Sequence, residues 1–122
     1  LPLAVEAVRR HGLAGDVVLS SFHAPVMRLA QDQAKDTERA LIVDQRHRED
    51  VVALAASVGC AGLHPSRVVT TPLLLQRCRE AGLALRCWTV DDPAEMARFM
   101  AMGVDGIVSD VPGLVREVAA RG

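Results

Sequence analysis

The chain has 122 residues, half of them hydrophobic and 24% charged, which is enough to bury the core of one domain and excludes a disordered segment. Its 14 basic and 15 acidic residues give a formal net charge of −1 without a block of one sign, so neither nucleic acid nor an anionic membrane is an expected partner. No stretch approaches the roughly 20 apolar residues of a membrane span, and residues 1–20 lack the pattern of a signal peptide.

Apolar runs typical of strands alternate with helical patterns along the chain. A helical pattern over residues 2–11 comes first, and the later apolar runs begin about 22 residues apart. We expect strands at 17–21, 40–44, 61–64, 84–90 and 106–109, and further helices at 24–32, 48–58, 71–81, 93–102 and 111–120. Strand, helix, strand in this rhythm predicts parallel pairing with right-handed crossovers.

Individual residues mark the ends of these elements. Four glycines stand where a helix should end in the left-handed conformation: Gly12, Gly59, Gly82 and Gly103. Three helix starts carry an oxygen-bearing side chain ahead of a proline: Thr70 or Thr71, Asp92, and Asp110. Two sets of apolar side chains are expected in the core: Met96, Phe99 and Met100 on one helix face, and the reduced cysteines Cys60, Cys78 and Cys87.

Five βα units of this length fit either an open doubly wound sheet or part of an eight-stranded barrel, which needs about 250 residues in full. No GxGxxG or GxxxxGK[ST] loop follows any strand, as a nucleotide-binding doubly wound domain would require. Instead, polar residues close every strand at its C-terminal end: Ser21 and His23, Asp44, His64 and Ser66, Thr89 and Asp91, and Ser109 and Asp110. The predicted fold is α/β, with parallel βα repeats that form the C-terminal part of a (β/α)₈ TIM barrel.

Three strand ends resemble the glycerophosphodiester phosphodiesterase family. Leu13 to Phe22, which ends in Ser-Ser-Phe, is similar to the family's fourth barrel strand. Gly82 to Asp91, with Arg-Cys-Trp-Thr-Val-Asp, is similar to its seventh strand, and Gly103 to Pro112, with Gly-Val-Asp-Gly-Ile, to its eighth. Three positions depart from the usual pattern: His23 for Asp or Asn, Asp91 for Asn, and Ser109 for Thr. The resemblance covers nearly the whole chain, and it implies that residues 1–122 are one segment with barrel strands four to eight.

The family's catalytic motifs are absent from this sequence. They lie on its first three strands: a His-Arg-Gly opening, a Glu-Asn pair, a Glu-x-Asp metal-binding strand, a His-Asp loop and a Glu-x-Lys strand. His11-Gly12 is no substitute, because it ends a helix. Since the chain starts with Leu1 rather than Met, we expect either that an N-terminal segment was removed or that the chain is a piece of a longer protein. The resemblance implies that the metal and the acid-base groups belong to that missing N-terminal part. No catalytic and no metal-binding residue is therefore assigned to this chain.

The resemblance implies metal-dependent hydrolysis of glycerophosphodiesters to glycerol 3-phosphate and an alcohol, with Mg²⁺ or Ca²⁺ in the complete enzyme. This chain alone is expected to bind no metal and to be inactive. Its predicted substrate-binding residues are Phe22, His23, His64, Trp88 and Asp91. In the family, the residues matching Phe22 and Trp88 line the apolar side of the pocket near the glycerol end.

Structural explanations remain open for the same residues. A strand buries tryptophan routinely, and a lone histidine is more often structural. Asp91, Asp92 and Asp110 could all cap helices, while His11 and His47 are expected to be solvated.

The alternative function is a non-catalytic α/β module that binds a small ligand or associates with itself. An open five-stranded sheet would expose one edge at Val17 and the other at Gly106, and exposed edges invite pairing. Partners are therefore expected to be the substrate together with either the missing N-terminal half or a second copy. The expected location is the cytoplasm.

Overall fold

The computed structural model describes residues 18–33 and 35–121. Within these residues five strands alternate with five helices: β1 (Val18–Ser21), α2 (Ala24–Gln33), β2 (Glu38–Val43), α3 (Val51–Ser57), β3 (Gly62–Pro65), α4 (Pro72–Ala81), β4 (Ala84–Cys87), α5 (Pro93–Met102), β5 (Gly106–Ile107) and α6 (Pro112–Arg121). The predicted helix over 2–11 and Gly12 lie outside the described residues. No described helix has the length and apolar character needed to cross a membrane.

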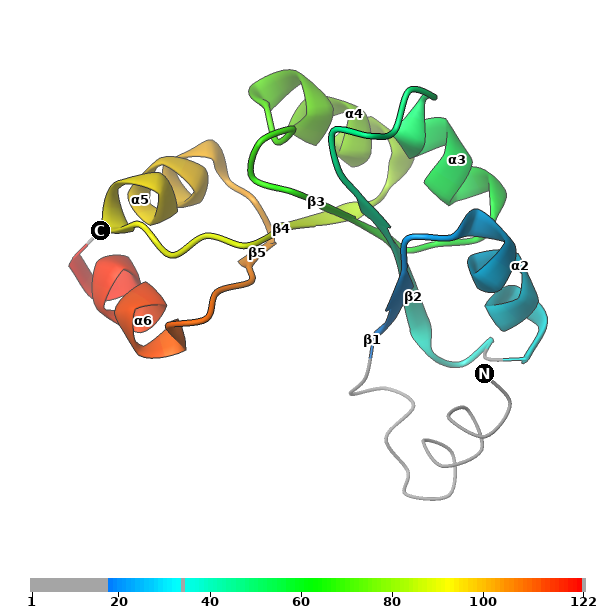
Figure 1. The fold of residues 1–122 in the computed structure, drawn as a ribbon, viewed down its shortest axis with the longest axis horizontal. Coiled ribbons are helices and arrows are strands. Elements are labelled where there is room, and N and C mark those ends of the chain that lie inside the picture. The colour runs from blue at the N-terminus through cyan, green and yellow to red at the C-terminus, as the bar shows by residue number, and fades with distance from the viewer. Residues whose placement is uncertain (1–17, 34, 122) are drawn as a thin grey trace.

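The strands form one parallel sheet in the order β1-β2-β3-β4-β5. Each strand therefore pairs with its neighbours in sequence, whereas a doubly wound sheet reverses its strand order at a switch point. Figure 1 shows the helices as an arch over one face of this sheet, from α2 through α3 and α4 to α5 and α6. Consecutive order with helices on one side is the arrangement of a (β/α)₈ barrel, so the prediction of barrel units is confirmed.

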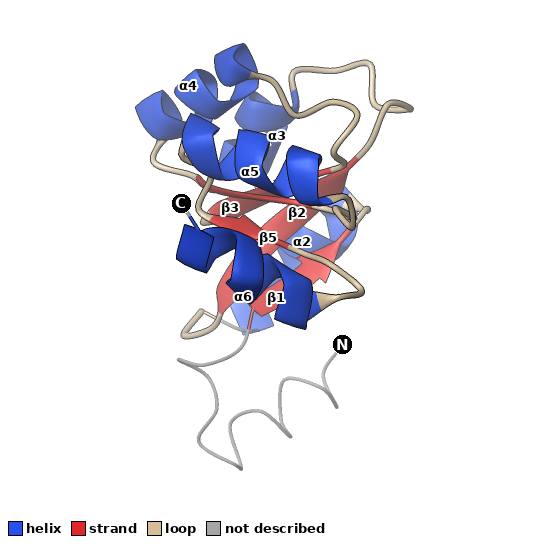
Figure 2. Ribbon diagram, turned by 90° about the vertical axis from the view of Figure 1, so that its left-hand side faces the viewer, coloured by secondary structure: helices blue, strands red, loops and turns tan. Residues whose placement is uncertain are grey.

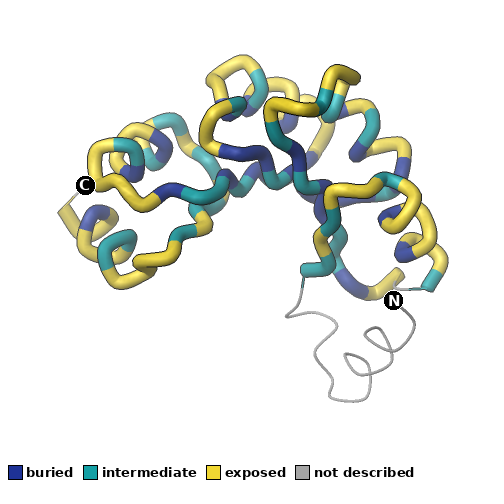
Figure 3. Tube along the Cα trace, viewed as in Figure 1, coloured by how far each residue is buried: buried dark blue, intermediate teal, exposed yellow. Residues whose placement is uncertain are grey.

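A row of leucines forms the centre of the face that the helices cover. Leu41 is paired with Leu63, and Leu63 with Leu85, and all three side chains are completely buried. Burial of one such side chain stabilises the fold by about 1.5–3 kcal/mol. Met96 and Phe99 of α5 are also fully buried, as predicted. Figure 3 shows the buried positions concentrated along the strands and on the inner sides of the helices.

The three cysteines belong to this core, as the sequence predicted. All are buried and free of disulfides. Burial raises the pKa of the Cys78 and Cys87 thiols to about 11. Neither thiol is therefore ionised at neutral pH, and both serve as small apolar side chains.

The opposite face of the sheet, called the open face below, carries the alternate residues of the strands. The central strands place six residues there in two successive rows: Ala40, Gly62 and Ala84, then Ile42, His64 and Arg86. In Figure 2, α5 and α6 lie side by side in front of the strands, and α2 lies behind them, because the sheet is curved and the helices follow its outer side. In a complete barrel this face surrounds the barrel axis.

Most predicted helix ends are confirmed. Gly59, Gly82 and Gly103 have φ values of 73°, 73° and 89°, the left-handed conformation that glycine adopts without strain. Thr71, rather than Thr70, accepts the hydrogen bond that caps α4, and Asp92 caps α5 in the same way. Before α6 the prediction was off by one residue, because α6 begins at Pro112 and Val111, not Asp110, precedes it.

Several predicted boundaries were displaced by local contacts. Helix α3 begins at Val51 rather than at residue 48, because the Asp50 carboxylate accepts from the Ala53 N–H and starts the helix there. Strand β2 begins two residues earlier than predicted, at Glu38. Strand β4 ends at Cys87, three residues before the predicted end, since Trp88 makes only an isolated bridge to Ser66.

Candidate functional site

The loops after β2, β3 and β4 enclose a shallow pocket of about 290 Å³. It is lined by Asp44, Gln45, Ser66, Arg67, Val68, Trp88 and Thr89. Two hydrogen bonds to β3 hold Trp88 in place: its indole Nε1 donates to the His64 carbonyl at 2.7 Å, and its backbone N–H donates to the Pro65 carbonyl at 3.1 Å. A larger hollow on the surface of α2 does not involve the strand ends. The candidate site is therefore the pocket at the carboxyl ends of the strands, where parallel α/β folds place their ligands.

Phe22 and Trp88 come from opposite parts of the chain and meet at this rim. Their ring centroids are 5.9 Å apart and the rings are nearly perpendicular, at 87°. The Arg46 guanidinium carbon lies 5.7 Å from the Phe22 centroid. Because Phe22 remains 38% exposed, the pair presents an accessible apolar surface beside polar groups.

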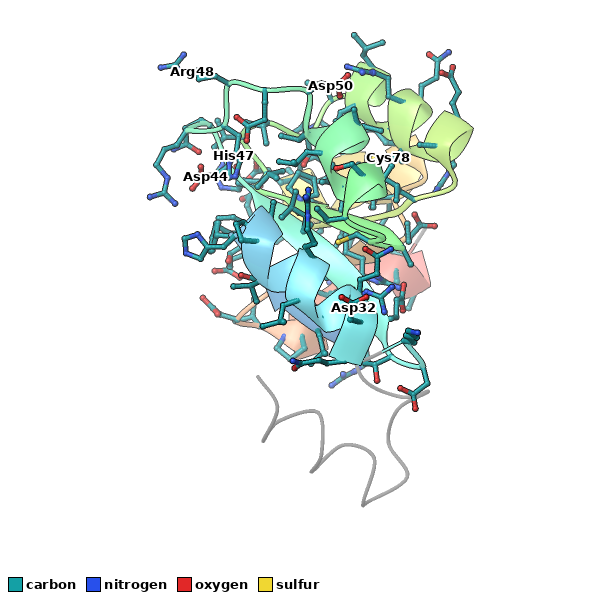
Figure 4. The ribbon with its side chains drawn as sticks, turned by 90° about the vertical axis from the view of Figure 1, so that its right-hand side faces the viewer. Asp32, Asp44, His47, Arg48, Asp50 and Cys78 are labelled. Carbon is teal, nitrogen blue, oxygen red and sulfur yellow. The ribbon has the colours of Figure 1, made fainter. Side chains whose placement is uncertain are left out.

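The loop after β2 is organised around Asp44. Its carboxylate accepts from the Arg46 side chain, with Nε 2.9 Å and Nη2 2.8 Å from Oδ2. The Arg46 hydrogen bonds hold the pKa of Asp44 below its usual value. His47 accepts the Asp44 backbone N–H at Nδ1, 3.2 Å away, and Figure 4 shows the two residues close together. The expectation of a solvated His47 was wrong, because this contact leaves its side chain only 16% exposed.

Asp91 joins the loops that follow β4 and β5. Its Oδ1 accepts from the Ser109 hydroxyl at 2.8 Å and from the Asp110 backbone N–H at 2.9 Å. These two bonds, the Asp110 N–H first, lower the pKa of Asp91. Asp91 therefore connects two strand ends, while its neighbour Asp92 performs the helix-capping role considered for both.

His23 lies apart from the other candidates. It is exposed, and its carbonyl accepts from Val26 and Met27 at the start of α2. Among the described residues, no hydrogen bond or ion pair links the His23 ring to Phe22, Trp88 or Asp91. The structure thus brings together Phe22, Trp88 and the His64 backbone, whereas the exposed His23 follows Phe22 at the start of α2.

His64 and Arg86 form the polar centre of the open face. The His64 ring is partly buried, and its Nε2 is 3.4 Å from Nη1 of Arg86. The same Arg86 nitrogen lies 3.6 Å from the Glu38 carboxylate. Desolvation, and then the Arg86 charge, lower the pKa of His64, while Glu38 acts in the opposite direction. Desolvation and the Arg86 charge thus favour the uncharged form of the His64 imidazole.

Sequence reasoning missed the polar residues Gln45 and Arg67, which line the pocket, and Arg86 on the open face. Arg86 was not singled out, although a charged residue within the apolar run 84–87 is a usable signal. Ser66 was noted only as a rim residue, yet its hydroxyl is buried without a hydrogen-bond partner beside the pocket. No feature of the local sequence predicts that a particular serine will lack a partner.

The described residues do not fit a divalent metal ion. Within the ranges 18–33 and 35–121, no group of three or more His, Cys, Asp or Glu side chains could hold one. Two of the strand-end carboxylates are already engaged, Asp44 by Arg46 and Asp91 by Ser109. No chemical step through a metal can be assigned to these residues.

Five consecutive parallel βα units with polar strand ends define this chain as part of a TIM barrel. A comparison with family models matches residues 3–114 to the glycerophosphoryl diester phosphodiesterase family, and the chain belongs to that family. The resemblance seen in the sequence is thereby confirmed.

Individual relatives agree in fold and in extent. A glycerophosphodiester phosphodiesterase of Caldanaerobacter subterraneus subsp. tengcongensis is 27% identical over 118 residues, which are 97% of this chain and 48% of the relative. The crystal structure of a glycerophosphodiester phosphodiesterase from Parabacteroides distasonis has a TM-score of 0.84 and 26% identity, and covers 98% of this chain and 50% of that one. An Oleispira antarctica phosphodiesterase, solved with the product sn-glycerol-3-phosphate, shares the fold with a TM-score of 0.84 at 20% identity, over 96% of this chain and 47% of its own. The chain thus spans about half the length of these relatives.

Proposed function

We propose that this chain is the C-terminal part, barrel strands four to eight, of a metal-dependent glycerophosphodiester phosphodiesterase. The reaction is hydrolysis of a glycerophosphodiester to glycerol 3-phosphate and an alcohol, and the compartment is the cytoplasm. The observation that carries the proposal is the aromatic pair of Phe22 and Trp88, 5.9 Å apart at the mouth of a barrel segment that belongs to this family.

In this proposal the chain supplies the wall of the substrate pocket. Phe22 and Trp88 pack against the carbon atoms of the glycerol end, where apolar contact is favourable. His64 and His23 offer polar contacts to the substrate. Asp91 keeps the loops after β4 and β5 at a constant distance through its bonds to Ser109 and Asp110.

The catalytic groups come from outside this chain. The ligands for Mg²⁺ or Ca²⁺ and the acid-base groups belong to a segment that precedes it in the complete enzyme. This division is supported by the match to only about half the length of the relatives. The chain alone is accordingly inactive.

Complementation tests this function. The N-terminal half of the Caldanaerobacter relative is co-purified with the chain, and release of glycerol 3-phosphate from glycerophosphocholine is measured with Mg²⁺ or Ca²⁺. We expect turnover only when both parts are present. Trp88→Ala should reduce that turnover at least tenfold, whereas Arg121→Met, at a side chain 72% exposed on α6, should not change it. A stable complex without activity on any glycerophosphodiester would contradict the proposal, and turnover by the chain alone would contradict its inactivity.

Self-association is the second candidate. It is favoured by one specific observation, namely that β1 and β5 are the edges of the described sheet. Unpaired edges can bind another copy, and the final prediction of the Discussion tests this possibility.

A further inference from the structure

The Arg86 side chain lies on the open face beside two glycines, Gly62 and Gly106. A Cβ atom added at Gly106 would stand 3.1 Å from Cγ of Arg86, and one added at Gly62 would stand 3.5 Å from its Nη1. The guanidinium at the end of this side chain approaches Glu38 of β2, with 3.6 Å between Nη1 and the carboxylate. The absence of side chains at Gly62 and Gly106 thus leaves room for one extended arginine that spans β5, β4, β3 and β2.

The contact between Arg86 and His64 determines where the histidine carries its proton. A guanidinium has only donors and does not lose its proton in proteins, so Nε2 of His64 must be the acceptor in the 3.4 Å contact. A neutral imidazole that accepts at Nε2 carries its hydrogen on Nδ1. Protonation of Nε2 would direct an N–H at the positive guanidinium, which disfavours the charged ring.

We propose that Arg86 is a positioning residue that holds His64 as the Nδ1–H tautomer, so that this histidine offers a hydrogen-bond donor to an oxygen of the substrate. Because Nε2 is engaged by Arg86 and Nδ1 bears a hydrogen, His64 is neither a general base nor a metal ligand. The identity of the acceptor, a phosphoryl or hydroxyl oxygen, rests on the proposed function. The tautomer itself does not.

The surrounding contacts make this arrangement rigid. The His64 carbonyl accepts the indole hydrogen of Trp88 at 2.7 Å, so the donor and the aromatic wall are parts of one connected unit. Glu38 from β2 and Arg86 from β4 are the charged groups that act on the ring. Glu38 and His64 both contact Nη1 of Arg86, so the ion pair helps to keep this donor near Nε2.

Nitrogen NMR of the 122-residue chain tests the proposal without any need for turnover. With ¹⁵N-labelled histidine, protonated and unprotonated ring nitrogens of a neutral imidazole resonate far apart, and His64→Gln assigns the His64 signals. We expect a hydrogen on Nδ1 and none on Nε2 over the neutral pH range. Arg86→Met should give a mixture of tautomers and a higher His64 pKa, whereas Arg86→Lys, which retains a charged donor, should preserve much of the original tautomer. Arg121→Met, the same replacement on α6, should leave both properties unchanged.

Each outcome decides the question. A wild-type His64 with its hydrogen on Nε2, or a tautomer unaffected by Arg86→Met, would overturn the proposal. Should Arg86→Met fail to fold by circular dichroism, Glu38→Gln is the second variant, and it must weaken the preference for Nδ1–H in the same direction. If only the complementation assay fails, the donation from His64 to a substrate oxygen is contradicted, whereas the Nδ1–H tautomer still stands.

Discussion

Asp91 accepts two hydrogen bonds that connect strand ends from two different βα units. Its pKa is lowered in the folded chain, so its ionised form stabilises the fold above the unfolded pKa of about 3.9, and this contribution is lost as the pH falls through the folded value. We therefore expect Asp91→Ala to lower the urea midpoint at pH 7, with a difference from wild type that narrows below about pH 4. Urea unfolding at pH 7, 5 and 3, followed by circular dichroism, measures this.

Asp32→Ala is the matched control for Asp91, because Asp32 lies on the exposed surface of α2, far from the strand ends (Figure 4). Its midpoint should follow that of the wild type at each pH. An Asp91→Ala difference that stays constant from pH 7 to pH 3 would show that the charge of Asp91 does not contribute to stability.

The two adjacent aspartates also show how far single residues could be predicted. Asp92 followed by Pro93 is a local capping pattern, and the structure confirms it. The role of Asp91 depends on Ser109 and Asp110, which are 18 and 19 residues away, so no local pattern could reveal it. The same limit applies to Arg86, whose partners Glu38 and His64 lie on other strands.

At the scale of elements, α5 depends on its cap more than on charge pairs at its surface. The Asp92 carboxylate accepts from the Glu95 N–H at 3.0 Å, and loss of such a cap costs about 1 kcal/mol. Asp92→Ala should therefore reduce the free energy of unfolding by about that amount. Asp92→Ser, which retains a capping oxygen, should recover most of the loss. Equal losses for both variants in urea titrations would argue against capping as the cause.

The order of elements followed from the sequence, but the strand ends did not. The spacing of about 22 residues and the glycines at helix ends reflect local geometry, so they predicted every described strand and helix. Strand β5 is only Gly106–Ile107, although the apolar run continues to Val108 and Ser109. The reason is that β5 is an edge strand, and its length depends on how far the single neighbour β4 extends beside it.

For the whole molecule, consecutive strand order leaves two edges that a closed barrel would join. β1 and β5 each pair with only one strand of the described sheet. The sequence predicted these edges near Val17 and Gly106; Gly106 lies in β5, as expected, and Val17 lies outside the described residues. Unpaired backbone groups together with exposed apolar side chains such as Phe22 and Val108 favour pairing with another chain.

We therefore expect the purified chain to form species heavier than the 13.1 kDa monomer, in proportions that rise with concentration. Native mass spectrometry and sedimentation velocity measure this.

A lysine on an edge strand opposes pairing of two edges, since burial of its charge in the contact costs free energy. Val108→Lys, directly after β5, should thus shift the distribution to monomer, whereas Val68→Lys should not, because Val68 is 63% exposed in the loop after β3 rather than beside an edge. A wild-type chain that is monomeric at every concentration, or equal dissociation by the two lysine variants, would rule out β5 as the contact. Addition of the N-terminal half of a relative should have the same effect as Val108→Lys on self-association, because both would occupy or block the edge that a complete barrel closes.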